Sequence, residues 1–188
     1  MSAEPRFPTR TAGGDSVGNA PVVHPAALSP AQLLDACQVR RTRRSGPGGQ
    51  HRNKVETAVI VTHPPSGVKG EASERRSQPQ NHRMALFRLR INLALEVRCQ
   101  RAAGEVPSPN WQSRCPAGRI CISPQHEDFP ALLAETLDVL SACEMDVKKA
   151  ASMLQTTSSQ LTRFLQLEPR ALMQVNAHRR QIGLRALL

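Results

Sequence analysis

The sequence predicts an α+β protein: a small domain with a mixed or antiparallel sheet and a packed helix, then a linker, then a small all-α domain of helix-turn-helix type. Two observations lead to this prediction. Short β-branched runs separated by proline and glycine turns are followed by a long helical pattern in the first half of the chain. Residues 125–188, in contrast, contain only helical patterns.

Composition divides the chain into four stretches. Residues 1–27 are rich in Gly, Pro, Ala and Ser without apolar periodicity, and we expect them to be disordered. Residues 28–101 hold the sheet and its helix. Residues 102–124 contain four prolines and two glycines without periodicity, which is typical of a flexible linker spanning roughly 25 Å. Residues 125–188 form the helical domain, and Trp111 of the linker is expected to dock on a domain surface.

The elements of the first domain follow in order. Ser29 and Pro30 look like the N-cap and first residue of a short helix. Residues 37–43 and 57–63 are expected as strands, and residues 68–72 as an antiparallel return strand. A helix should run from Pro79 to about Arg101. Its sheet-facing residues would be Met84, Phe87, Ile91 and Leu95, whereas Arg83, Arg88, Arg90 and Arg98 would face solvent or RNA.

The helical domain offers two interpretations. Helices are expected over residues 129–142, 146–154 and 159–167, the last capped by Ser158. The second and third resemble the DNA-binding end of Fis-type regulators, although Gln155 replaces the usual glycine of the turn. The would-be recognition helix offers one cation, Arg163, with Gln160, Thr162 and Gln166. The alternative is a small docking bundle in which Arg179, Arg180 and Arg185 touch RNA.

One segment has no apolar residue that could tie it to a core: Ser45-Gly46-Pro47-Gly48-Gly49-Gln50. Its adjacent glycines allow positive φ and a close approach to a partner. Six basic residues and no acid lie between positions 40 and 54: Arg40, Arg41, Arg43, Arg44, Arg52 and Lys54. Such a loop repels itself unless an anion offsets the charge, so we expect it to approach phosphate with Gln50 at its tip. An ordinary surface turn is the other interpretation of these glycines.

The whole composition narrows the function class. The net charge is +10, and the first hundred residues carry most of it, with 15 basic against 7 acidic residues. Aromatic residues make up 3%, which argues against a base-stacking platform. The five cysteines form no Cys-x-x-Cys pair, so we expect no metal, no cofactor and free thiols. No stretch resembles a membrane span or a leader, and we expect a cytoplasmic monomer.

The loop and the residues after it resemble the catalytic domain of class I peptide chain release factors. The resemblance rests on five blocks that occur in order between residue 38 and about residue 98: 45–50, 53–59, 62–68, 74–78 and Asn81. In that family the loop enters the ribosomal peptidyl-transferase centre and hydrolyses the ester that joins peptide to tRNA. The resemblance implies this catalytic role for Gly48, Gly49 and Gln50. It implies the ribosome, with its large-subunit rRNA, and peptidyl-tRNA as partners.

The resemblance also assigns the surrounding cations to rRNA contacts. This set comprises Arg40, Arg41, Arg43, Arg44, Arg52, Lys54, Arg75, Arg76 and Arg83. Ester hydrolysis places negative charge on the carbonyl oxygen, so a fixed N–H donor lowers the barrier, and we expect the backbone N–H of Gln50 to supply it. No side-chain base is assigned, because Glu56 is the only Asp, Glu or Cys within six residues of Gln50.

The subtype follows from what surrounds the loop. A full release factor carries a codon-reading domain upstream, whereas 44 residues precede the loop here. We therefore expect codon-independent peptide release from stalled ribosomes, although this chain ends in a near-neutral helical domain rather than a basic tail. The alternative is a non-catalytic nucleic-acid-binding protein that uses the helix-turn-helix-like domain.

Overall fold

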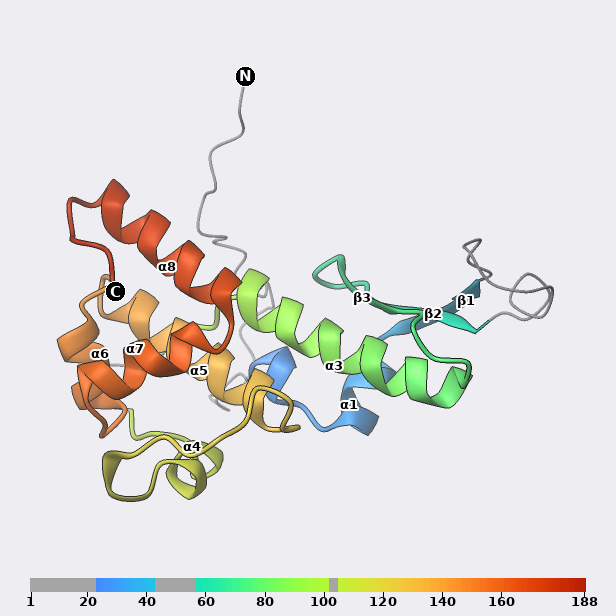
Figure 1. Cartoon of the computed structure of the whole chain (residues 1–188), viewed down its shortest axis with the longest axis horizontal. Coiled ribbons are helices and arrows are strands. Elements are labelled where there is room, and N and C mark those ends of the chain that lie inside the picture. Colours follow the sequence, from blue (N-terminus) through green and yellow to red (C-terminus); the bar gives the residue numbers. More distant parts are fainter. Residues whose placement is uncertain (1–22, 43–56, 102–104) are drawn as a thin grey trace, which may run out of the picture.

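The computed structural model describes residues 23–42, 57–101 and 105–188 (Figure 1). Residues 1–22, most of the stretch expected to be disordered, lie outside the described residues. No helix in the described ranges is long and apolar enough to cross a membrane. The elements are, in order, η1 (Pro25–Ala27), α1 (Pro30–Asp35), β1 (Gln38–Thr42), β2 (Ala58–His63), β3 (Val68–Ala72), α3 (Gln78–Glu96), α4 (Pro109–Arg114), η2 (Pro116–Gly118), α5 (Phe129–Ala142), α6 (Val147–Met153), α7 (Ser158–Gln166) and α8 (Pro169–Gln181).

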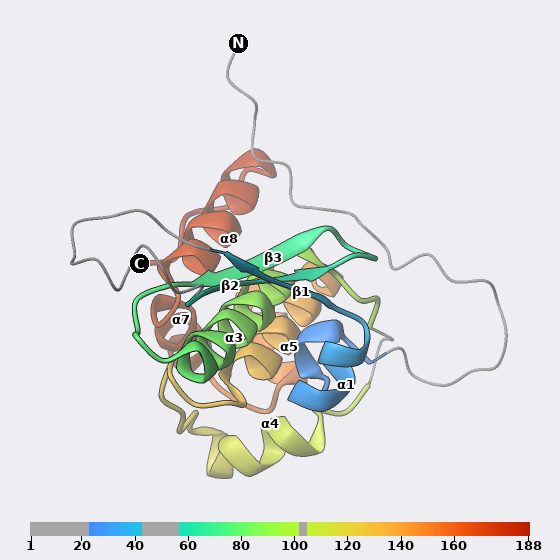
Figure 2. The same ribbon diagram turned by 90° about the vertical axis from the view of Figure 1, so that its right-hand side faces the viewer.

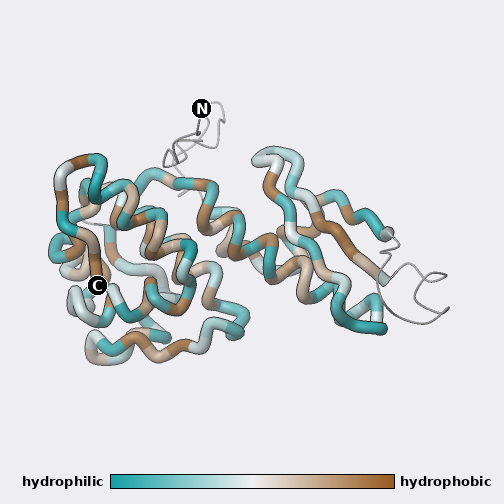
Figure 3. Tube along the Cα trace, turned by 45° about the horizontal axis from the view of Figure 1, so that its top comes forward, coloured by the Kyte–Doolittle hydropathy of each residue, from teal (hydrophilic) through white to brown (hydrophobic). Residues whose placement is uncertain are grey.

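The three strands form one antiparallel sheet in the order β1-β2-β3, which confirms the α+β prediction. Thr42 pairs with Ala58 at one end of the sheet, and His63 pairs with Val68 at the other end of β2. The central strand β2 is the most hydrophobic of the three, as Figure 3 shows. Each strand begins and ends within one residue of its expected position, because alternation and the 64–67 turn are both local signals.

Helix α3 covers one face of the sheet and continues beyond it (Figures 1 and 2). It packs against β2 and β3, and it also contacts α5 and η1. Leu89 and Leu93 are fully buried, and Ile91 and Leu95 are buried as expected. Met84, however, is 42% exposed. The prediction of a single sheet-facing stripe is therefore only partly right, because α3 is packed from more than one side.

The end of α3 also differs from the prediction. The helix stops at Glu96 rather than near residue 101, and the backbone becomes extended at Val97. The guanidinium of Arg98 turns back and donates to the carbonyl oxygens of Ala94 and Leu95, each at 2.6 Å. A buried cation thus satisfies carbonyls of the last turn, and the helix ends there.

The segment before the sheet is packed against this end of α3. Ser29 caps α1 as expected, and Gln32 completes a capping box. Ala26 is fully buried, and His24 is 7% exposed with its Nε2 3.1 Å from the carbonyl oxygen of Val97. Residues 23–27 are therefore part of the fold, in contrast to the disorder expected for them.

The four helices after residue 128 form a bundle beside the second half of α3 (Figure 1). Helix α5 occupies the expected residues 129–142, and Asp146 caps α6. Thr157 caps α7, one residue before the expected Ser158, because its side chain accepts the N–H of Gln160. Gln155, in the turn before α7, adopts the left-handed conformation with φ of 51°.

The described part of the expected linker is folded onto the bundle. Residues 105–124 contain α4 and η2, and Trp111 of α4 is 1% exposed. Its indole N–H donates to the carbonyl oxygen of Leu154 at 2.8 Å, and its ring packs edge-on to Phe164. The docking expected for Trp111 is thereby confirmed, whereas these residues are not a free tether. One continuous set of buried side chains runs from the sheet through α3 to the bundle. The division into domains stays a prediction.

Candidate functional site

The glycine-rich loop lies outside the described residues, and the structure describes the platform that carries it. Gly48, Gly49 and Gln50 belong to residues 43–56, as do Arg43, Arg44, Arg52 and Lys54. The two described ends of this segment are neighbours, since Thr42 and Ala58 pair across β1 and β2. Figure 1 shows this end of the sheet on the opposite side of the molecule from α6 and α7. The loop therefore starts and finishes at one site on a sheet backed by α3.

The five described arginines of the predicted RNA-binding set are all exposed. Arg40 and Arg41 lie on β1, an edge strand, next to the loop root at Thr42. Arg75 and Arg76 lie in the turn between β3 and α3, and Arg83 lies on α3. Asn81 connects this turn to Thr57 through hydrogen bonds to both segments. In the described residues, no ion pair is found for any of the five side chains. Their charges are thus available to an anionic partner near the loop.

Other arginines that the sequence left open to RNA are structural. Arg88 is 2.6 Å from Glu74 and also donates to the carbonyl oxygen of Glu71. Arg90 is 6% exposed and donates to the carbonyl oxygens of Ala26 and Glu127. Burial lowers the pKa of the Arg90 guanidinium, against the opposing charges of nearby acids.

Two more arginines that were expected to face solvent or RNA are buried within the fold. Arg98 is 8% exposed and pairs with Asp138 at 3.2 Å. Arg179 is 9% exposed and donates to backbone carbonyls of Met145 and Arg185. Of the three bundle arginines expected to touch RNA, only Arg180 and Arg185 are exposed. The sequence contained no local signal for this sorting, because the partners lie on distant segments.

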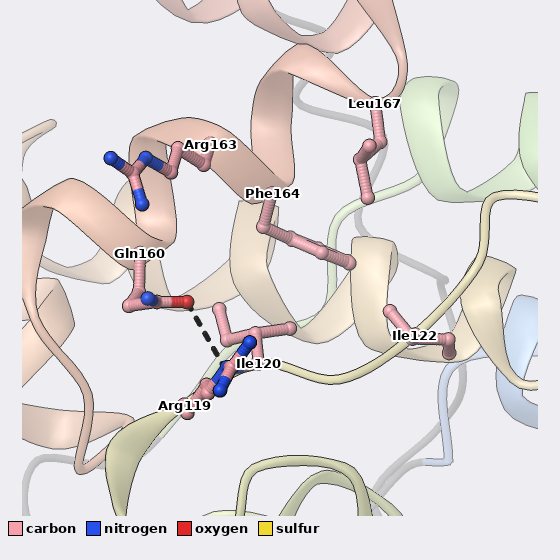
Figure 4. A pocket seen from close by; sticks show the side chains of 7 residues that line it. All are labelled: Arg119, Ile120, Ile122, Gln160, Arg163, Phe164 and Leu167. Atoms are coloured by element: carbon pink, nitrogen blue, oxygen red, sulfur yellow. Dashed lines mark hydrogen bonds between the residues drawn. The ribbon is translucent and has the colours of Figure 1, made fainter.

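A groove beside α7 is the other candidate surface, and Figure 4 shows its lining. Its volume is about 570 Å³, and Arg119, Arg163 and Gln160 form one part of it. The side-chain oxygen of Gln160 accepts the backbone N–H of Ile120 at 3.3 Å. The hydroxyl of Thr156 donates to the carbonyl oxygen of Gly118 at 2.6 Å. Residues 118–120 therefore cross the face on which a recognition helix would read bases, so the structure does not favour DNA reading by α7.

The remaining part of the groove is apolar and belongs to the core. Phe164 lines it but is only 2% exposed. Its ring contacts Trp111 and Phe129, with centroids 6.0 Å and 5.3 Å away. A ring held in this way is not free to stack on a base. The groove thus lacks the aromatic and cationic density of a nucleic-acid site.

Three potential metal ligands meet where η1, α3 and α5 join. Atoms of His24, Cys99 and Asp138 lie within 4.8 Å of one another. Nδ1 of His24 already accepts the N–H of Ala26 at 3.0 Å, which leaves Nε2 as the donor toward Val97. One carboxylate oxygen of Asp138 accepts from Arg98 and from the N–H of Cys99. Both ring nitrogens of His24 and one carboxylate oxygen of Asp138 are thus engaged within the protein, and the cluster forms a buried polar junction.

This junction makes the stability depend on pH. Burial lowers the pKa of His24 to about 4 from its ordinary 6.5, with the Val97 carbonyl opposing and the Arg98 charge reinforcing the shift. The stability linked to this lowered pKa is fully present above pH 6.5. It is lost as the pH falls toward 4, because the unfolded chain then binds the proton more tightly than the folded protein does. The loss reaches about 3 kcal/mol at most.

Urea unfolding at pH 7 and pH 4.5, with and without His24→Gln, measures this loss. Burial also raises the pKa of Asp138 to about 6. This shift changes the stability in the opposite direction over part of the same pH range, because here the folded protein binds the proton more tightly. Comparison of the two proteins cancels that contribution. We expect the parent to lose more stability between the two pH values than His24→Gln does. Equal losses would contradict the assignment to His24.

The fold and the platform define a class of domain: a small sheet, backed by one helix, that holds both ends of a glycine-rich loop among exposed arginines. Residues 34–114 match the family model described as RF-1 domain. This part of the chain is therefore similar to the RF-1 domain of peptide chain release factors.

Curated relatives agree with this assignment. Peptide chain release factor 1 of Xylella fastidiosa is 38% identical over 86 residues, which are 46% of this chain and 23% of the relative. Peptide chain release factor 1 of Verminephrobacter eiseniae is 43% identical over 79 residues, which are 42% of this chain and 21% of the relative. A chloroplastic peptide chain release factor of Arabidopsis thaliana is 51% identical over 61 residues, which are 32% of this chain and 13% of the relative. The chain thus spans less than a quarter of the length of these relatives. No solved structure matched the chain.

Proposed function

We propose that this protein hydrolyses the ester of peptidyl-tRNA on the ribosome and releases the nascent peptide without reading a stop codon. The observation that carries the proposal is the match of residues 34–114 to the RF-1 domain, which includes the Gly48-Gly49-Gln50 loop. The ribosome is the partner that this match implies. Large-subunit rRNA would be contacted through the arginines around the loop root.

The chemistry assigned to the loop needs few groups. When water attacks the ester, negative charge develops on the carbonyl oxygen and then on the leaving ribose oxygen. A backbone N–H held at that position stabilises the charge, and one such donor contributes about 3 kcal/mol, or ~10²-fold in rate. We assign this donor to Gln50. The side chain of Gln50 would sit where the nucleophile enters and admit water while excluding larger nucleophiles.

The strands at the two ends of the loop segment support the proposal, because the loop must be held in a defined position. Thr42 and Ala58 pair across β1 and β2, and α3 packs against β2, in which Val59 and Val61 are buried. Both described ends of the loop segment thus belong to one packed unit, which would fix where the segment starts and ends. Arg41 and Arg75 lie near these ends and would orient the domain on phosphates.

Peptide release by substituted loops tests the mechanism. Purified protein is mixed with ribosome complexes that hold labelled peptidyl-tRNA, and released peptide is measured over time. Gly49→Ala should abolish release, because a Cβ obstructs the close approach of the backbone. Gln50→Pro, which removes the N–H, should lower the rate by about 10²-fold, far more than Gln50→Ala. Gly67→Ala, in the β2–β3 turn, is the matched control and should release peptide like the parent. Full activity of Gln50→Pro would disprove the donor assignment.

The codon in the decoding site tests independence from stop codons. Complexes with a stop codon, a sense codon or no codon should release peptide at similar rates. Release only at stop codons would contradict codon independence while retaining the hydrolysis. No release under any of the three conditions, together with specific binding to naked duplex DNA that survives removal of residues 38–98, would support the non-catalytic alternative.

A further inference from the structure

Asn81, near the start of α3, joins three backbone groups from two other segments. It is fully buried. Its side-chain nitrogen donates to the carbonyl oxygen of Thr57 at 2.7 Å and to that of Arg75 at 2.8 Å. Its side-chain oxygen accepts the N–H of Arg75 at 3.0 Å. Both amide hydrogens and the amide oxygen are therefore in use.

These partners admit only one orientation of the amide. The N–H of Arg75 requires an acceptor, and the two carbonyls require donors, so the oxygen and nitrogen of Asn81 cannot exchange places. An aspartate at this position has the same shape but no hydrogen to donate when ionised, and it would face two carbonyl oxygens. A serine has one hydrogen to donate. Among side chains of this length, only asparagine satisfies the arrangement.

Asn81 joins two segments that matter for the proposed function: the chain directly after the catalytic loop, and the basic turn between β3 and α3. Thr57 is the first described residue after the loop. Arg75 lies in the turn that exposes two cations of the predicted RNA-binding set. We propose that Asn81 is a positioning residue, which fixes the distance between the root of the catalytic loop and the basic turn that meets rRNA. This inference rests on the proposed function.

Asn92 of the same helix provides a matched control. Its side-chain nitrogen donates to the carbonyl oxygen of Lys69 in β3 at 2.7 Å, and its oxygen accepts from Arg170 at 2.9 Å. Asn92 thus joins α3 to backbone as Asn81 does, but at the β2–β3 turn end of β3, away from the loop. If α3 amides act only by holding the fold together, both asparagines should behave alike. If Asn81 positions the loop, only its loss should affect the rate of the chemical step.

Single-turnover peptide release over a range of factor concentrations separates these outcomes. The variants are Asn81→Asp, Asn81→Ala and Asn92→Ala, each compared at equal folded concentration from urea unfolding curves. We expect both Asn81 variants to lower the rate at saturation by about 10- to 100-fold, because small misplacements of reacting groups cost this much. The concentration for half-maximal rate should change by less than about twofold, and Asn92→Ala should retain both values. Parent-like saturating rates for Asn81→Asp, or equal losses for Asn92→Ala, would overturn the proposal.

Hydrogen exchange tests the positioning without any activity. In Asn81→Asp, the amides of Ala58 and Val59 should exchange faster than in the parent, whereas in Asn92→Ala they should not. Unchanged exchange at these positions in Asn81→Asp would overturn the proposal even if the variant is inactive. If the parent itself releases no peptide, the proposed function fails, and the exchange result still decides whether Asn81 anchors the loop root.

Discussion

Gly70→Ala should separate the sheet from α3 and abolish peptide release. A Cβ at Gly70 would overlap the backbone carbonyl oxygen of Ala85 and the backbone nitrogen of Leu89, and would lie 2.8 Å from the Leu89 Cα. These are helix backbone atoms, which cannot rotate away as a side chain could. We expect a loss of about 3 kcal/mol or more in the free energy of unfolding, which is a large share of the stability of an ordinary domain.

Urea unfolding followed by circular dichroism measures this effect, and Gly67→Ala is the control. Gly67 belongs to the same hairpin and has φ of +72°, but no atom lies within 4 Å of a Cβ built there. Gly67→Ala should therefore show only the conformational cost of the left-handed region, about 1–2 kcal/mol. Equal destabilisation by the two substitutions would show that the close approach of β3 to α3 is not the cause.

Asp138→Ala should destabilise the protein by about 3–5 kcal/mol, because it removes the carboxylate that is paired with the buried guanidinium of Arg98. The two side chains are 8% and 3% exposed, with Arg98 Nη1 3.2 Å from a carboxylate oxygen of Asp138. Burial raises the pKa of Asp138 to about 6, while the Arg98 charge and the Cys99 N–H oppose the shift. Two donors, the Arg98 guanidinium and the Cys99 N–H, face one oxygen of this carboxylate and favour its ionised form. The substitution also removes the link between α5, which carries Asp138, and the segment directly after α3.

A double-mutant cycle measures this pair by urea unfolding. Arg98→Leu combined with Asp138→Leu should cost much less than the sum of the single substitutions, because the double variant buries no charge. Glu74→Ala is the control, since Glu74 and Arg88 form a 2.6 Å pair with exposed side chains. Its loss should cost less than about 1 kcal/mol. Additive costs for Arg98 and Asp138 would contradict their direct coupling.

Local signals in the sequence were sufficient for much of the fold. The three strands, the cap of α1 by Ser29 and the extent of α5 all follow from spacing, turn residues and capping residues within a few positions. The glycine-rich loop was recognised for the same reason, since its motif is contiguous. Its structure and the roles of Gly48, Gly49 and Gln50 remain predictions, as these residues lie outside the described ranges.

Long-range contacts explain where the sequence predictions differ from the structure. Arg83 and Arg90 belong to the same helix and have the same chemistry, yet one is exposed and the other is buried. Arg90 is buried because its partners, the carbonyls of Ala26 and Glu127, come from distant parts of the chain. Residues 105–124 lack periodicity, but the indole of Trp111 finds its acceptor at Leu154 in the turn after α6.

The sequence by itself determined which residues form the three strands and the cap of α1, because each of these depends on neighbours along the chain. Only the tertiary structure decided which arginines carry free charge and which satisfy buried backbone carbonyls. It also decided that one amide, that of Asn81, connects Thr57 to Arg75. The physical reason is that a buried polar group must be paired, and its partner is chosen by packing rather than by position in the chain.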